Sequence, residues 1–464
     1  MLKKRVYISF HKYYNEGSFP YERNAMMKRE ELRAYIERGD AAYTARADRD
    51  IELHRKGDFE LCLFEADGTP VSDATVTVEQ LDIDFNFGAS IFMLGEYADE
   101  ARNRLYEKKF TEIFNTATIP LYWEGTEPRE GYLRYDRGTP HDVYRRPPVQ
   151  EVMDFCQANG LHMKGHPLFW HEFVAEWLPE CYADLKPHIA RRFAEIAKIC
   201  GDQVESYDVV NEPSRIYDVH MRDRRTGRKH LVPDDDYCVD LFRLAKQHFP
   251  ASKLILNDVT GAVFGEFRGK YSGFYLNVKD LLSRGVPIDE IGLQCHIAKG
   301  PEGAYNTEIL YDILDTYASL GKTLNISEIS IPSTFDDGED EELQAEAAVR
   351  LYKACFSHPA MTGITWWNLP DDGVLTTQRI AAGENMPSTA LLGFDYHEKA
   401  AYKALKKLIR EEWHTNLTTK ASTGVLKFRG FYGKYKITVT RGGKASTFTV
   451  NLAKKAPTVR SIKL

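Results

Sequence analysis

Residues 85–413 alternate between short apolar runs and longer segments whose apolar positions recur at helical spacing. The segment 183–200 is representative, because its apolar residues fall at i, i+4, i+7, i+8 and i+11 and so share one helical face. Each short run precedes such a segment, which indicates strands that alternate with helices. The predicted strands are residues 85–91, 119–123, 162–168, 204–210, 253–257, 291–296, 323–329 and 363–367.

Eight strands alternating with helices predict an α/β fold, a (β/α)8 or TIM barrel, over residues 85–420. The span exceeds the roughly 250 residues of a typical barrel, which leaves room for insertions in the loops. A doubly wound open sheet is the alternative architecture. No glycine-rich phosphate loop follows the first predicted strand, and this favours the barrel.

Alternation of apolar and polar positions, typical of half-buried strands, flanks the barrel on both sides. Residues 59–63 alternate in this way, and after a turn at 67–68 the strand 75–78 is predicted to pair back against them. Near the C-terminus, the strands 435–439 and 447–450 are predicted to form a hairpin, because two glycines separate them.

Neither group contains enough strands to be stable alone. We therefore predict that residues 56–84 and 421–464 together form one small β-sandwich-like module. Residues 1–55 are predicted to be a charged, helical extension, in which residues 29–38 form a surface helix ended by Gly39.

The overall composition excludes several classes of function. A net charge of -7 gives no basic surplus for a nucleic-acid partner. The start of the chain lacks the apolar stretch of a secretory signal, and no window could span a bilayer, so we expect no membrane partner. The expected location is the cytoplasm, or outside the cell if a signal has been removed. Seven scattered cysteines without a CxxC pair predict neither a disulfide framework nor a metal site, and no cofactor is expected.

Two glutamates stand at the ends of predicted strands. Glu212 follows the strand 204–210, and Glu328 lies near the end of the strand 323–329. The carboxyl ends of barrel strands carry the chemistry of TIM-barrel enzymes. Glycoside hydrolysis requires two carboxyl groups, one to protonate the leaving oxygen and one to attack the anomeric carbon. The two glutamates therefore predict a glycoside hydrolase.

Other strand ends carry polar and aromatic residues at matching places, and with them the chain resembles the family ten glycoside hydrolases, whose best-known members are retaining endo-β-1,4-xylanases. The resemblance extends from residue 85 to residue 413. It is carried by Gly-His-Pro-Leu-Phe-Trp-His at 165–171, Asp-Val-Val-Asn-Glu at 208–212, Asn257-Asp258, Gln294 with His296, Ser-Glu-Ile at 327–329, Trp367, Gly-Phe-Asp-Tyr at 393–396 and Lys-Ala-Ala-Tyr at 399–402.

The resemblance implies a retaining hydrolase that cleaves β-glycosidic bonds in a xylan-like polysaccharide or oligosaccharide. Glu212 would be the acid/base, protonated at rest, and Glu328 the ionised nucleophile. His296 would hydrogen-bond the nucleophile, and Asn211 would bind the 2-hydroxyl of the sugar. Further residues expected at the site, as walls of the reacting sugar or as supporting groups, are His166, Trp170, His171, Gln294, Trp367 and Trp123.

The substrate-binding half of the family's pattern is altered. Typical members carry Asn and Lys on the second strand and Gln after the Trp-His motif, whereas this chain has Ile119, Tyr122 and Phe173. The second tryptophan expected soon after Asp371 is missing. An apolar wall would leave xylan hydroxyls without partners, so we predict weak activity on plain linear β-1,4-xylan.

The loop after Glu212 is rich in positive charge, and on a barrel it lies on the catalytic face. It would favour substrates with acidic substituents, unless its charges only face solvent. These charges are Arg215, Arg222, Arg224, Arg225, Arg228 and Lys229.

Two other classes of function remain open from the sequence. One is a non-catalytic carbohydrate-binding barrel protein, which the presence of both glutamates disfavours. The other is a metal-dependent hydrolase built on His166, His171 and Glu172, which lacks the second histidine of an HExxH motif.

Overall fold

The computed structural model describes residues 40–218, 229–297, 307–335, 337–374, 388–454 and 459–464, together with residues 29, 30, 33 and 36. The predicted helix 29–38 lies largely outside this part of the chain, although its four described residues are helical. Four of the six charges predicted for the loop after Glu212, at positions 222, 224, 225 and 228, also lie outside it. Within the described residues, no helix is long and apolar enough to cross a membrane.

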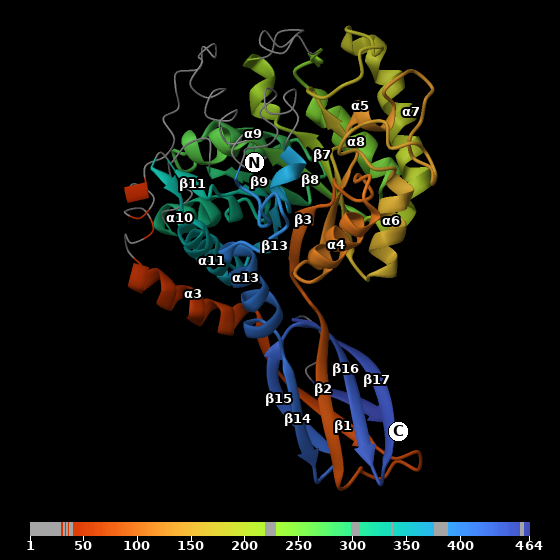
Figure 1. Cartoon of the computed structure of the whole chain (residues 1–464), viewed down its shortest axis with the longest axis vertical. Helices are drawn as coiled ribbons and strands as arrows, with labels where there is room; N and C mark the ends of the chain where they lie inside the picture. The colour runs from red at the N-terminus through yellow and green to blue at the C-terminus, as the bar shows by residue number, and fades with distance from the viewer. Residues whose placement is uncertain are drawn as a thin grey trace.

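Eight parallel strands close into a barrel, which confirms the (β/α)8 prediction (Figure 1). Neighbouring strands pair in the order β5-β4-β3-β13-β10-β9-β8-β7, and pairing of Lys164 with Ser206 between β5 and β7 closes the ring. A short strand, β6 (Phe169–Trp170), runs beside the end of β7. The barrel strands are β3 (Asn86–Ser90), β4 (Thr116–Pro120), β5 (His162–His166), β7 (Ser206–Asn211), β8 (Lys253–Asp258), β9 (Glu290–His296), β10 (Thr323–Ser330) and β13 (Met361–Trp366).

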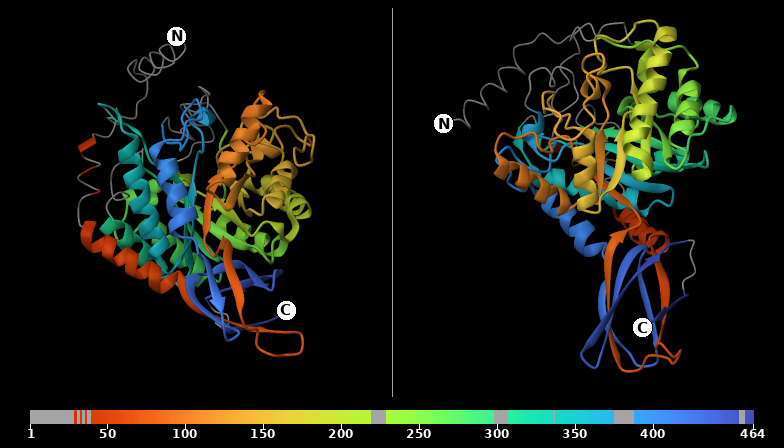
Figure 2. Two further views of the ribbon diagram at one scale, coloured as in Figure 1. Left: turned by 60° about the horizontal axis from the view of Figure 1, so that its bottom comes forward. Right: turned by 90° about the vertical axis from the view of Figure 1, so that its right-hand side faces the viewer.

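Helices cover the outside of the barrel and bury their apolar faces against it (Figures 1 and 2). The helix predicted at 183–200 is α7, and it buries Leu185, Ile189, Phe193 and Ile196. The helices that follow the strands are α4 (Glu100–Thr111), α5 (Trp123–Thr126), α6 (Val149–Ala158), α7 (Tyr182–Cys200), α8 (Tyr237–His248), α9 (Gly273–Ser283), α10 (Thr307–Ala318), α11 (Glu341–Ser357) and α13 (Ala400–Lys407).

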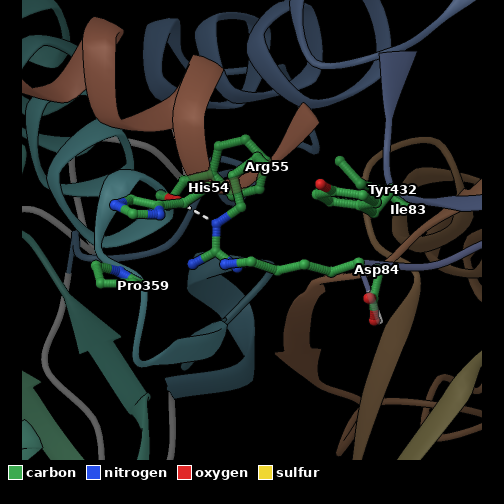
Figure 3. Close-up of a pocket in the computed structure, with 8 residues that line it drawn as sticks. His54, Arg55, Ile83, Asp84, Pro359 and Tyr432 are labelled. Carbon is green, nitrogen blue, oxygen red and sulfur yellow. Dashed lines mark hydrogen bonds between the residues drawn. The ribbon is translucent and has the colours of Figure 1, made fainter. Parts of the chain in front are cut away.

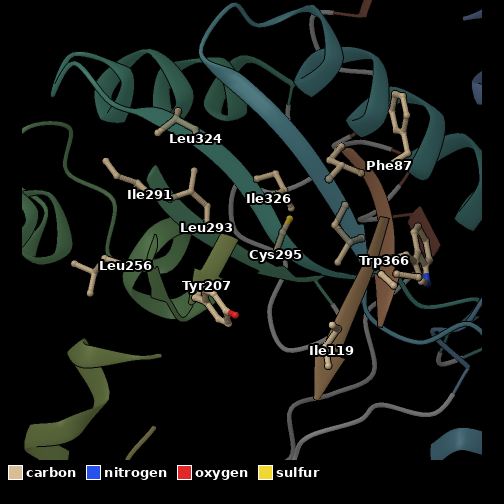
Figure 4. Packing of buried hydrophobic residues seen from close by; sticks show 14 of the residues in the cluster. Phe87, Ile119, Tyr207, Leu256, Ile291, Leu293, Cys295, Leu324, Ile326 and Trp366 are labelled. Carbon is tan, nitrogen blue, oxygen red and sulfur yellow. The ribbon is translucent and has the colours of Figure 1, made fainter. Parts of the chain in front are cut away.

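The core of the barrel is filled by strand side chains such as Tyr207, Leu293 and Ile326, which Figure 4 shows together with Cys295 and Trp366. All five are fully or almost fully buried. Burial raises the pKa of the Cys295 thiol, so this residue serves as an apolar filler of the core.

The second barrel strand lies three residues earlier than predicted. It is β4 (Thr116–Pro120) rather than 119–123, and Trp123 begins the short helix α5. The strand was hidden because buried threonines, Thr116 and Thr118, interrupt its apolar pattern while suiting a strand by their branching at Cβ.

Strands from both ends of the chain form two further sheets below the barrel (Figure 1). One sheet has the order β15-β1-β18 and the other β14-β2-β16-β17, and their inner faces share a separate apolar cluster. The boundaries of the predicted module, 56–84 with 421–464, stay a prediction. The strands are β1 (Lys56–Phe64), β2 (Ala74–Ile83), β14 (Asn416–Ala421), β15 (Val425–Phe431), β16 (Gly433–Arg441), β17 (Lys444–Leu452) and β18 (Val459–Lys463).

The C-terminal hairpin is confirmed, since β16 and β17 pair around Gly442 and Gly443, both with positive φ. The predicted pairing of 75–78 back against 59–63 is wrong. The strand β1 pairs with β15 and β18, while β2 pairs with β14 and β16. The alternation indicated which side chains point inward, but it did not indicate which strands pair. Leu61 and Val76 lie on two opposing sheets and contribute to one apolar cluster between them.

The strand β2 leads directly into β3, so the two sheets adjoin the amino-terminal ends of the barrel strands. Arg55 connects the two parts, because its guanidinium donates to the carbonyl oxygens of His358 (2.7 Å) and Met361 (2.8 Å). A small cavity at this junction is lined by Arg55, Asp84 and Tyr432 (Figure 3). Burial lowers the pKa of Arg55 to about 10, so the side chain stays charged at neutral pH.

Candidate active site

The two predicted glutamates lie at the carboxyl-terminal ends of β7 and β10, opposite the accessory sheets. Glu212 follows β7 directly with a left-handed backbone (φ 55°), and its amide donates to the carbonyl of Asn257 at 2.8 Å. An irregularity in the pairing of β10 with β9 leaves Glu328 opposite Gln294. The two residues are only 6% and 4% exposed. Two carboxyl groups are thus held, nearly buried, at the end of the barrel where chemistry is expected.

Two amide side chains join the carboxyl groups into one network. Asn257 Nδ2 donates to Glu328 Oε1 (3.1 Å) and to Asn211 Oδ1 (2.7 Å). Gln294 Nε2 donates to Glu212 Oε1 (3.0 Å) and reaches Asn211 Oδ1 at 3.5 Å. Asn211 therefore lies between the two glutamates and shares partners with both.

His296 contacts the second oxygen of Glu328. Its Nε2 lies 2.9 Å from Glu328 Oε2, and its Nδ1 lies 2.9 Å from the Ser330 hydroxyl. The side chain is thereby fixed at both ring nitrogens. This is the contact that the sequence led us to expect, and it holds the Glu328 carboxyl group in one orientation.

Burial raises the pKa of Glu328 to about 7, and repulsion from Glu212 acts in the same direction, whereas His166 opposes it. Two buried carboxyl groups that repel each other retain a proton between them at pH values where an isolated carboxyl group would lose it. The pair can therefore hold one proton near neutral pH, and the raised pKa falls on Glu328, the group that the sequence led us to expect in its ionised form.

A buried charge cluster lies beneath Glu328. Asp208 Oδ2 accepts from Lys164 Nζ (2.9 Å) and from His166 Nδ1 (2.7 Å), and Asp208 is fully buried. Burial works against ionisation of Asp208, but these two partners outweigh it and lower its pKa. The other ring nitrogen, His166 Nε2, lies 4.0 Å from Glu328 Oε1 and is buried without a hydrogen-bond partner among the residues that the structure describes. It is available to a hydroxyl group of a bound substrate.

Aromatic rings surround His166. The centroid of the Trp367 ring lies 5.3 Å away and that of Tyr122 5.5 Å away, each in an edge-on arrangement. Trp170 stacks on Phe173 at 4.9 Å, and its indole nitrogen, like His166 Nε2, is buried and has no hydrogen-bond partner within the described part of the chain. The strand β6 brings Trp170 beside Asn211. His166, Trp170, Asn211 and Trp367 are thus gathered around the two glutamates.

The sequence profile described as Glycosyl hydrolase family 10 matches residues 81–408. The chain belongs to glycosyl hydrolase family 10. The match covers the whole barrel and all of α13, and it includes every site residue described above.

Curated relatives support this membership at low identity. A β-1,4-xylanase of Dictyoglomus thermophilum is 29% identical over 309 residues, 62% of this chain and 78% of the relative. The anti-sigma-I factor RsgI6 of Acetivibrio thermocellus is 24% identical over 429 residues, 89% of this chain and 49% of the relative. Endo-1,4-β-xylanase 2 of Arabidopsis thaliana is 24% identical over 398 residues, 84% of this chain and 33% of the relative. This chain therefore spans about half or less of two of these three relatives.

Solved structures share the fold. The crystal structure of xylanase 10B from Thermotoga petrophila RKU-1 in complex with xylobiose aligns with a TM-score of 0.54 at 21% identity. The alignment covers 71% of this chain and 95% of that chain. Native xylanase 10B from Thermotoga maritima aligns equally well, with a TM-score of 0.54 and 21% identity.

Three residues that departed from the family 10 pattern occupy different places. Tyr122 and Phe173 belong to the aromatic cluster beside His166, but both are buried and so do not line an open wall. Ile119 is fully buried in the barrel core and does not reach the site. Where the sequence led us to expect an open apolar wall, Tyr122 and Phe173 therefore fill space beside His166, and Ile119 takes no part.

Two expected site residues lie further away. Trp123 packs in the barrel core, where its indole nitrogen donates to Glu127 (3.3 Å) and its ring meets Trp177 edge-on. His171 is buried next to Glu172, with 3.7 Å between His171 Nε2 and Glu172 Oε1, and burial lowers its pKa well below the usual value. His171 is thus a neutral residue behind the site. Within the described chain, no three histidine, cysteine or acidic side chains group as metal ligands.

Arg215 bridges two carboxylates at the edge of the site. Its guanidinium pairs with Glu212 Oε2 at 2.9 Å and with Glu172 Oε1 at 3.0 Å. The sequence identified Arg215 only as one charge of a basic loop. Lys229, at the other end of that loop, is buried and donates to backbone carbonyls of Glu176 and Leu178. Of these two described charges, Arg215 is the one that pairs with Glu212.

Sequence reasoning missed the Lys164–Asp208 pair. A signal was present, because both charges lie inside predicted barrel strands, where a buried ionised group is rare unless it is paired. The same reasoning missed Arg146, whose guanidinium lies 3.6 Å from the centroid of the Tyr122 ring. No local pattern marks Arg146, since it belongs to a loop between α5 and α6.

Proposed function

We propose that this chain is a retaining β-glycoside hydrolase of family 10 that acts on a xylan-like β-glycan, with Glu212 as acid/base and Glu328 as nucleophile. The observation that carries the proposal is the network through Asn257, Asn211 and Gln294, which links two nearly buried carboxyl groups at the carboxyl-terminal end of the barrel. Membership of family 10 supports the same assignment.

In the first step, Glu328 attacks the anomeric carbon while Glu212 donates its proton to the leaving oxygen, and the glycosidic bond breaks. His296 and Asn257 hold one oxygen of Glu328 each, so the attacking carboxylate needs little reorientation. A covalent glycosyl-enzyme with an ester bond to Glu328 results, and the leaving sugar departs with the proton.

In the second step, Glu212, now a carboxylate, takes a proton from water as the water oxygen attacks the anomeric carbon. The ester bond to Glu328 breaks and the sugar leaves with its original anomeric configuration. Asn211, positioned between the glutamates, would bind the 2-hydroxyl of the sugar in both steps. His166 Nε2 and Trp170 Nε1 supply further polar contacts to the sugar, since neither has a hydrogen-bond partner among the described residues.

The test is hydrolysis of a panel of 4-nitrophenyl β-glycosides, with the anomer of the first product read by NMR. We expect the β anomer to form first, followed by slow mutarotation. Glu328→Ala should abolish turnover, whereas Glu212→Ala should retain activity on substrates with good leaving groups and be rescued by azide with retention. An α anomer as first product would exclude the retaining mechanism. Absence of any hydrolysis by the unmutated protein would instead favour a non-catalytic sugar-binding barrel.

A further inference from the structure

Four side chains fill the space next to His166 and Trp367. We call them the plug: Phe92, Tyr122, Arg146 and Phe173. The Arg146 guanidinium lies 3.6 Å from the centroid of Tyr122, 5.5 Å from that of Phe92 and 6.0 Å from that of Phe173. Tyr122 also meets Phe92 at 5.8 Å and Phe173 at 5.7 Å, edge-on in both cases. Phe92, Tyr122 and Arg146 are each 1% exposed and Phe173 is 4% exposed. The region is therefore packed solid with side chains.

The plug is held from behind by the backbone around it. Arg134 donates to the carbonyl of Arg146 at 2.9 Å, and Arg146 itself donates to the carbonyl of Arg145 at 3.1 Å. Gly125 lies directly under the Arg146 side chain, because a Cβ at this position would come within 2.6 Å of Arg146 Cγ. The missing side chain of Gly125 thus allows Arg146 to lie flat against Tyr122.

Among the described residues, the contacts of the plug lead to Glu328. Phe92 and Tyr122 touch the rings of Trp367 and His166, and His166 is the neighbour of Glu328. On the other side, Glu212 borders Arg215, whose side chain is 43% exposed. Among the described residues, the site is therefore packed on the side of Glu328 and borders a partly exposed side chain on the side of Glu212.

The proposed roles of the two glutamates indicate which part of the substrate lies on each side of the site. Glu212 protonates the leaving group, so the departing chain lies on the side of Glu212. A sugar attacked by Glu328 would lie against His166 and Trp367, and its far end would then face Tyr122, whose ring centroid is 5.5 Å from that of His166. In a linear glycan, the next sugar on the non-reducing side is attached at that far end, where the plug now lies.

We propose that the plug confines the substrate to a single sugar on the non-reducing side, so that the protein removes one terminal sugar at a time from a β-linked chain. This inference rests on the proposed retaining function. It replaces internal cleavage by cleavage at the chain end, because no second sugar can occupy the space filled by Tyr122, Arg146 and Phe173.

The test compares 4-nitrophenyl β-xyloside with 4-nitrophenyl β-xylobioside, and the glucoside with the cellobioside. We expect the bioside to release nitrophenol only after a lag, because its terminal sugar must leave first to produce the monoside. The initial rate of nitrophenol release from the bioside should be lower by at least about 100-fold, since even one misplaced methylene in a pocket costs about 10- to 200-fold.

A hexaose of the accepted sugar, labelled at its reducing end with 2-aminobenzamide, provides a second readout. Early products should consist of free monosaccharide and a labelled pentaose. Immediate release of nitrophenol from the bioside, or early labelled products of several lengths, would overturn the proposal while leaving the retaining function intact. If none of the aryl glycosides is hydrolysed, the proposed function itself fails and the inference falls with it.

The variant Tyr122→Ala/Phe173→Ala should open the space and shorten the lag, raising the bioside rate relative to the monoside rate. Tyr122→Phe keeps the ring, so the ratio of the two rates should stay as in the unmutated protein. Phe193→Ala removes an equally buried ring from the outer face of the barrel, on α7, and controls for lost stability. If the double variant is folded and active but keeps the unmutated ratio, the plug does not set the cleavage position.

Discussion

Arg215 offers a direct test of how Glu212, the proposed acid/base, is controlled. In the structure, its guanidinium pairs with Glu212 at 2.9 Å and with Glu172 at 3.0 Å. An adjacent positive charge stabilises the carboxylate over the protonated acid, yet the first catalytic step needs the acid. Replacing Arg215 by methionine should therefore keep Glu212 protonated to higher pH, and the basic limb of the kcat/KM profile should move upward.

The size of the shift follows from the geometry. Two unit charges about 4 Å apart interact by about 4 kcal/mol at an effective dielectric constant of about 20. The Arg215 side chain is 43% exposed and is shared with Glu172, so solvent screening reduces its effect on Glu212 to about 1 kcal/mol. Because about 1.4 kcal/mol corresponds to one pH unit, we expect the limb to rise by roughly 0.5 to 1 unit at low salt.

The assay is the pH dependence of kcat/KM for a 4-nitrophenyl glycoside, measured for the unmutated protein and Arg215→Met at low and high salt. The shift should shrink at high salt, because screening already weakens the ion pair in the unmutated protein. Arg215→Lys retains the charge and should leave the limb nearly in place. Glu172→Gln removes the competing carboxylate, so Arg215 should act more strongly on Glu212 and move the limb downward.

Substrates with a very good leaving group provide the internal control. A 2,4-dinitrophenyl glycoside needs little protonation of its leaving oxygen, so Arg215→Met should hardly change its basic limb. If the limb of the 4-nitrophenyl substrate does not move, or if both substrates shift equally, Arg215 does not act through the protonation of Glu212.

Three further outcomes follow from the structure. Since the pKa of Glu328 is raised to about 7 by burial and the nucleophile must be ionised, kcat/KM should rise with pH and reach half its plateau near pH 7; a flat profile between pH 5 and 8 would contradict this. Asp208→Asn leaves Lys164 buried without its carboxylate and should lower the free energy of unfolding in urea by about 3–5 kcal/mol, whereas Lys164→Met/Asp208→Leu should lose much less. Deleting residues 421–464 removes β15, β16, β17 and β18 and exposes the apolar faces of β1 and β2, so the product should be poorly soluble; a monomeric product with an unchanged melting temperature would refute the shared module.

The order of the barrel strands and the two glutamates could be derived from the sequence because both leave local signals. Strands buried on both faces read as apolar runs, and Glu212 and Glu328 stand where two of these runs end. The Asn211, Gln294 and His296 positions carried the same kind of signal, and the structure places all three in contact with a glutamate or with its partners.

Strand partners and side-chain neighbours depended on the tertiary structure. A period of two in β1 and β2 determines which side chains face inward. The same pattern suits a hairpin as well as two opposed sheets. Burial of the two apolar faces against each other selects the opposed sheets. Likewise, the sequence indicated Tyr122 only as a residue that replaces a sugar-binding group of the family. Its place in the packed plug depends on Arg146, which reaches it from a loop 24 residues further along the chain. Arg215 read as one of many loop charges, whereas folding placed it between Glu172 and Glu212. Such contacts join residues through space, and their energies depend on burial that no local pattern of residues records.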